Sequence, residues 1–163
     1  MLNAFTSCAA VAAFTTLASA QSFNIDVGTA TPAPTTPFGA GASQPGVWNT
    51  YAGGTLNNLL DLAGTPTGVT LAASNNSGFL GSNNDPATLG DDENLIDDLM
   101  LVPFLDSYTF SGLAGGTYDV YAYTWTFQQL PTDMQVNGGG YQTVGGAWPG
   151  GYVAGITHSL QSV

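Results

Sequence analysis

The chain contains neither lysine nor arginine, and this absence restricts its possible functions more than any other feature. Its 163 residues include eleven Asp and Glu and one His, so the formal net charge is -11. Without basic side chains the chain cannot neutralise phosphate groups, and we expect it to bind neither nucleic acid nor anionic membranes. Lysine Schiff-base chemistry is excluded for the same reason.

Residues 1–20 have the pattern of an export signal. A run of small apolar residues ends in Ala18-Ser19-Ala20, an A-x-A cleavage pattern. We therefore expect a signal peptide over residues 1–20 and a secreted or cell-surface mature chain; a buried N-terminal helix is the alternative. The single cysteine, Cys8, lies in this segment, so the mature domain would have no disulfide and no cysteine metal ligand. No later apolar run approaches the length of a membrane span.

Residues 21–163 are expected to form one mainly-β domain. Apolar and polar residues alternate in residues 23–27, which would place Phe23, Ile25 and Val27 on one buried face. Residues 107–127 alternate twice, which indicates a hairpin or a pair of strands that crosses between sheets. Within them, Tyr118 fits a tyrosine corner, in which the hydroxyl bonds the backbone at the start of a strand. These patterns predict a mostly antiparallel β-sandwich, with further strands expected after residue 163.

One helix is expected, over residues 91–100. Leu95, Ile96, Leu99 and Met100 would form one apolar stripe, and three acidic residues would occupy the N-terminal cap and first turn. The preceding residues 75–86 are expected to form a loop.

Acidic residues are concentrated near this helix, which makes calcium the expected cofactor if the chain binds any. Calcium prefers clustered oxygen ligands, and no basic side chain relieves the repulsion between the acids. The candidate metal ligands are Asp85, Asp91, Asp92 and Glu93. Their spacing matches neither an EF-hand nor a Gly-rich calcium repeat, and a solvated acidic helix face is the alternative.

Four segments resemble uncharacterised exported bacterial proteins that look like galactose-binding-like β-sandwiches and often end in a PEP-CTERM-type sorting tail. The segments are residues 23–28 (FNIDVG), 46–49 (GVWN), 91–98 (DDENLIDD) and 110–120 (FSGLAGGTYDV). The resemblance covers most of the mature chain and implies a jelly-roll or galactose-binding-like sandwich. No sorting tail is visible, and the resemblance transfers no catalytic residue.

Aromatic residues supply the candidate ligand site. Three tryptophans and several tyrosines give more ring surface than a small core needs, and rings beside amide side chains commonly hold sugars. Trp148 is the best candidate because it lies in a Gly/Pro loop, where a ring is more exposed than on a strand. The candidate binding residues are Trp148, Trp48, Trp125 and Tyr123. The alternative is that these rings belong to the core.

We therefore expect a secreted, non-catalytic binding module, with a polysaccharide or cell-surface glycan as the leading ligand. A structural component of an extracellular layer, with calcium-supported assembly, is the alternative from another class. A hydrolase with paired carboxylates is a third. A Ser-His-Asp triad would need His158, but no G-x-S-x-G motif is present, and we expect a half-exposed histidine on a strand.

Overall fold

The computed structural model describes residues 21–74, 79–82, 84–101, 106–124 and 131–163, and these residues are mainly strands. In chain order the elements are β1 (Asn24–Val27), the short 3-10 helix η1 (Ala40–Ala42), β2 (Trp48–Tyr51), β3 (Thr55–Leu56), β4 (Thr70–Ala73), β5 (Phe79–Ser82), α1 (Asp91–Ile96), β6 (Asp98–Leu101), β7 (Tyr108–Ser111), β8 (Asp119–Tyr123), β9 (Thr132–Met134), β10 (Gln142–Val144) and β11 (His158–Ser162). The mainly-β class expected from the sequence is therefore confirmed.

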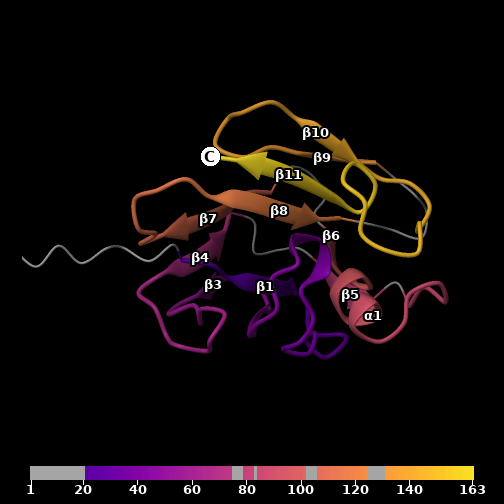
Figure 1. Cartoon of the computed structure of the whole chain (residues 1–163), viewed down its shortest axis with the longest axis horizontal. Coiled ribbons are helices and arrows are strands. Elements are labelled where there is room, and N and C mark those ends of the chain that lie inside the picture. Colours follow the sequence, from indigo (N-terminus) through magenta and orange to yellow (C-terminus); the bar gives the residue numbers. More distant parts are fainter. Residues whose placement is uncertain (1–20, 75–78, 83, 102–105, 125–130) are drawn as a thin grey trace, which may run out of the picture.

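The strands pair into small sheets, most of them antiparallel. The antiparallel sheets have the orders β3-β4-β7, β5-β6, β8-β11 and β9-β10, whereas β1 and β2 pair in parallel. In Figure 1, β8, β11, β9 and β10 lie in the upper part of the molecule, β1, β3 and β4 lie below them, and α1 and β5 lie at one end. No helix in the described part of the chain is long and apolar enough to cross a membrane. The sandwich arrangement stays a prediction.

Strand β1 is covered on both faces, which the alternating sequence did not predict. Ile25 and Val27 pack as expected against a buried apolar cluster that contains Tyr51. The opposite face is polar but even less accessible, because Asn24 and Asp26 are 8% and 0% exposed. The predicted packing of the apolar face is therefore confirmed, and the burial of the polar face is a further finding. The parallel pairing with β2 accounts for it, since parallel strands are commonly covered on both sides.

The predicted helix over residues 91–100 is only half correct. Helix α1 ends at Ile96, and Asp98–Leu101 form β6, which pairs antiparallel with β5. The loop predicted for residues 75–86 therefore contains a strand. Two adjacent acids at the C-terminal end oppose the helix dipole, so continuing the helix through Asp97 and Asp98 is unfavourable. Pairing with β5 supplies an alternative partner for the backbone.

The tyrosine corner is confirmed. The Tyr118 hydroxyl donates to the carbonyl of Ala114 at 2.8 Å, at the entrance to β8. Strands β7 and β8 do not form a hairpin, because β7 pairs with β4 and β8 pairs with β11. The alternative of a chain that crosses between sheets is therefore the correct one.

Candidate functional site

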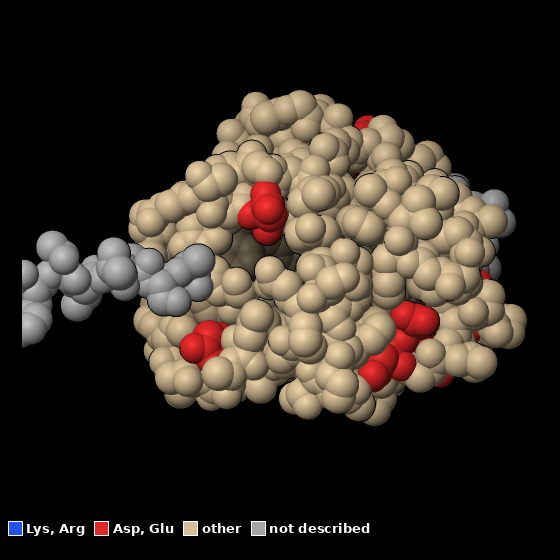
Figure 2. Space-filling view, viewed as in Figure 1, with Lys and Arg blue, Asp and Glu red and all other residues tan. Residues whose placement is uncertain are grey.

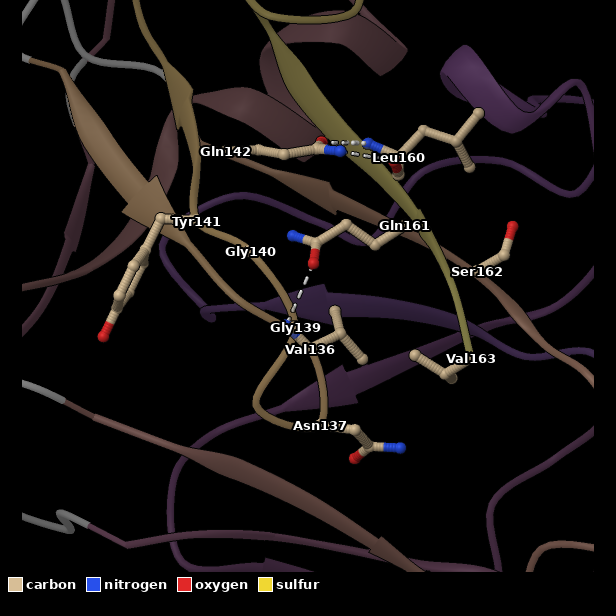
Figure 3. Close-up of a pocket in the computed structure, with 10 residues that line it drawn as sticks. All are labelled: Val136, Asn137, Gly139, Gly140, Tyr141, Gln142, Leu160, Gln161, Ser162 and Val163. Atoms are coloured by element: carbon tan, nitrogen blue, oxygen red, sulfur yellow. Dashed lines mark hydrogen bonds between the residues drawn. The ribbon is translucent and has the colours of Figure 1, made fainter.

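The candidate site is an open hollow of about 700 Å³ between the β9–β10 hairpin and β11. Its lining is uncharged and consists of Val136, Asn137, Gly139, Gly140, Tyr141, Gln142, Leu160, Gln161, Ser162 and Val163 (Figure 3). The hairpin reverses through Asn137 and Gly138, both of which have positive φ, and the Gly139 N–H donates to the Val136 carbonyl at 2.9 Å. This is the arrangement of a type I′ turn, for which Asn-Gly is the preferred sequence.

Two glutamine side chains hold β11 against the hairpin. The Gln142 amide donates to the Leu160 carbonyl at 2.9 Å and accepts from the Leu160 N–H at 3.1 Å. The Gln161 amide accepts from the Val136 N–H and donates to the Met134 carbonyl, both at 3.1 Å. Figure 3 shows the Gln142 amide directed at the Leu160 backbone. These side-chain amides form hydrogen bonds between β11 and the hairpin, in place of the backbone hydrogen bonds that two neighbouring strands would form. They therefore fix the shape of the hollow.

Tyr141 and Asn137 are two exposed lining side chains that a ligand could stack on or hydrogen-bond, and the apolar Leu160 and Val163 are also exposed there. Tyr141 is 63% exposed, and its ring extends away from β11 at the edge of the hollow (Figure 3). The Asn137 amide is exposed at the tip of the turn, and no hydrogen bond of that amide is found in the described part of the chain. The site therefore offers one aromatic face and one free amide group.

No Asp or Glu is among these lining residues; the nearest acidic contact that the described residues show is Asp119 of β8, whose carboxylate accepts from the hydroxyl of the lining Ser162. Figure 2 shows the acidic side chains of one face as separate groups, surrounded by uncharged residues. In a chain with a net charge of -11, a neutral ligand meets the least repulsion at such an uncharged surface, and an anionic ligand is disfavoured everywhere.

The aromatic residues predicted to bind a ligand come together, but in a different place. Trp48, Tyr123 and Trp148 are half-buried and pack, with Tyr152, around Leu95 and Ile96 of α1. The rings of Trp148 and Tyr123 both contact Tyr152 edge-on, with centroids 5.7 and 5.5 Å away. The Trp48 indole N–H donates to the Phe38 carbonyl at 3.2 Å. Trp125 lies outside the described residues.

The four predicted calcium ligands lie around α1, and Asp91 and Asp85 each have hydrogen-bond donors of their own. Asp91 accepts from the Thr35 N–H at 2.8 Å and from the Thr35 hydroxyl at 2.6 Å, and these bonds lower the pKa of its carboxyl. Asp85 accepts from the Ala87 N–H at 2.7 Å. Asp92 and Glu93 lie in the first turn of α1. Among the described residues, no group of three or more His, Cys, Asp or Glu side chains could hold a metal ion.

His158 is more buried than expected. Its side chain is 5% exposed and lies beside the rings of Tyr121 and Tyr123, so the expected half-exposed position is wrong. Nδ1 lies 3.2 Å from the Thr157 hydroxyl oxygen, and burial lowers the pKa of the imidazole. The described residues show no carboxylate bonded to this ring, as a triad would need.

Tyr141 is one of the tyrosines that contribute to the excess of ring surface, but the Gly/Pro loop around Trp148 favoured that residue as the candidate. Tyr141 follows three glycines, Gly138 to Gly140, so the same argument could have selected it.

Comparison with protein families, with curated proteins and with solved structures finds no match for this chain. The resemblance to exported galactose-binding-like proteins therefore stays a prediction, and the function must be argued from the site.

Proposed function

We propose that this protein is a secreted, non-catalytic module that binds a neutral glycan at the hollow between the β9–β10 hairpin and β11. The observation that carries the proposal is the exposed ring of Tyr141 beside a concave surface without any charged residue. An aromatic face can stack on the apolar face of a sugar ring, and the amide of Asn137 can bond its hydroxyls.

The charge of the chain supports a neutral ligand. Uronic acids, sulfated sugars and phosphates would need a cationic partner, and the chain has neither Lys nor Arg. The open shape fits one side of an extended polysaccharide better than a small molecule, which is usually enclosed on most sides.

The test is binding of the full chain to neutral polysaccharides (β-glucans, xylans, galactans and mannans), followed by calorimetry with the tightest binder. We expect Tyr141→Ala to weaken binding about tenfold or more, and Tyr141→Trp to retain it because the aromatic face is kept. Asn137→Gly removes the amide but tolerates the positive φ of the turn, so it should weaken binding without unfolding the hairpin.

Two results would contradict the proposal. One is a glycan that binds wild type and Tyr141→Ala equally well. The other is a glycan whose binding is lost in Trp148→Ala but kept in Tyr141→Ala. This result would place the binding site at the aromatic residues beside α1. Leu89→Ala is the matched control, because Leu89 is 75% exposed and lies outside the hollow.

A further inference from the structure

Two buried carboxylates, Asp26 and Asp98, lie between β1 and β6, and neither is among the metal ligands predicted from the sequence. Asp26 of β1 is 0% exposed, and neither of its carboxylate oxygens has a hydrogen-bond partner in the described part of the chain. Asp98, the first residue of β6, is 8% exposed. Its Oδ1 accepts from the Thr31 N–H at 2.9 Å, but its Oδ2 is buried and also lacks a partner.

Gly28 makes room for this arrangement. A Cβ atom at Gly28 would lie 2.5 Å from Oδ2 of Asp98, closer than any real side chain could approach. The φ angle of Gly28 is 142°, a conformation that residues with a side chain rarely adopt. The absence of a side chain at this position therefore lets the Asp98 carboxylate close against β1, two residues from Asp26.

The neighbouring Asp97 shows what the pair lacks. Asp97 is also 0% exposed, but it accepts from the Thr88 hydroxyl at 2.9 Å and from the Asp85 N–H at 2.7 Å. A buried carboxylate needs such donors or an opposite charge, because its desolvation is otherwise very costly. Burial and the charge of Asp98 raise the pKa of Asp26 to about 7. The chain has no Lys or Arg to supply a counter-charge, so the pair depends on a cation or a proton from solution.

We propose that Asp26 of β1 and Asp98 of β6 together bind one calcium ion. The three unpartnered carboxylate oxygens are hard ligands of the kind that calcium prefers, and main-chain carbonyls and water commonly complete its coordination. Zinc does not suit the site, because it favours histidine and thiolate ligands and none is present there. This ion would neutralise the two carboxylates and connect β6 to β1, the first strand of the parallel pair.

The experiment uses the full chain, unfolded and refolded either in EDTA or with CaCl₂, so that a buried site can exchange fully. Equilibrium dialysis with ⁴⁵Ca²⁺ should give one ion per chain. At a free calcium concentration about 100 times the Kd, the thermal midpoint should rise by roughly 10 °C over the EDTA sample. Asp26→Asn and Asp98→Asn should each abolish both effects and should be at least as stable as wild type in EDTA, because each removes a buried charge.

The control is the double variant Asp92→Asn/Glu93→Gln, which neutralises two half-buried acids in the first turn of α1 and should leave calcium binding unchanged. The proposal is overturned if this control loses the bound ion while Asp26→Asn keeps it. It is also overturned if wild type binds no calcium at pH 7.5, in which case protons neutralise the pair. If Asp26→Asn fails to fold, Asp98→Asn and the wild-type stoichiometry still decide the question.

Discussion

The side-chain amide of Gln142 pairs with the main chain of Leu160 as a neighbouring strand would. It donates to the carbonyl and accepts from the N–H of the same residue, at 2.9 and 3.1 Å. Strand β11 is therefore bonded to β8 by its backbone on one edge, and on the other edge it is bonded to the hairpin through the side chains of Gln142 and of its own Gln161.

Replacement of Gln142 by alanine should lower the free energy of unfolding by about 1–2 kcal/mol, because two hydrogen bonds are lost. Urea unfolding followed by circular dichroism measures the change. Gln135→Ala is the control, because among the described residues the Gln135 amide bonds the Gly139 carbonyl within its own turn and nothing on β11. If the two variants lose the same unfolding free energy, the hydrogen bonds of Gln142 to β11 contribute no more stability than a bond within the turn.

The tyrosine corner gives a second prediction. Tyr118→Phe removes only the hydroxyl that donates to Ala114, so we expect a loss of about 1 kcal/mol in unfolding free energy. Tyr141→Phe removes an exposed hydroxyl and should change stability by less than about 0.5 kcal/mol. A thermal or urea midpoint for Tyr118→Phe equal to that of wild type would contradict a structural role for this bond.

Stability should also depend on pH through His158. Burial lowers the pKa of the folded imidazole, so the unfolded chain binds its proton more readily. The contribution of His158 to stability is then present above the unfolded pKa of about 6.5 and is lost as the pH falls through the interval between the two pKa values.

The measurement compares the unfolding free energies of wild type and His158→Gln at pH 7.5 and pH 5. The acidic residues are common to both proteins, so their contributions cancel in the difference. We expect the variant to lose less stability on acidification than wild type. NMR titration should place the pKa of folded His158 below that of the urea-unfolded chain, and the reverse order would refute the argument.

Asp91 and Thr35 should be energetically coupled. A double-mutant cycle with Asp91→Asn and Thr35→Val should give a coupling of about 1 kcal/mol, since the cycle isolates the bond between the Thr35 hydroxyl and the carboxylate. Urea midpoints of the four proteins measure it. Additive effects of the two substitutions would mean that solvent replaces this bond without cost.

Local patterns predicted much of the fold. The alternation in residues 23–27 and 107–111 found strands β1 and β7, and the spacing around Tyr118 found the corner. Each of these signals lies within a few residues of the chain. The signal peptide and the calcium ligands around α1 stay predictions.

Features that depend on distant partners were missed. Residues 99–101 carry apolar side chains that suit a helix, and only the pairing of 98–101 with β5 makes them a strand. Asp26 alternates like a solvent-facing residue, and its burial depends on a segment more than 70 positions later. Likewise, Tyr141 and Trp148 both follow glycines, and only the packing of Trp148 against Tyr152 distinguishes them.

The contacts of α1 with the loop after β1 also govern the order in which the chain can fold. Thr31 bonds Asn94 and Asp98, and Thr35 bonds Asp91, across 56 to 67 positions. As the polypeptide is made, the loop between the two parallel strands has none of these partners until residues 91–98 have left the ribosome. The amino-terminal third of the domain therefore completes its structure only after most of the chain has been synthesised.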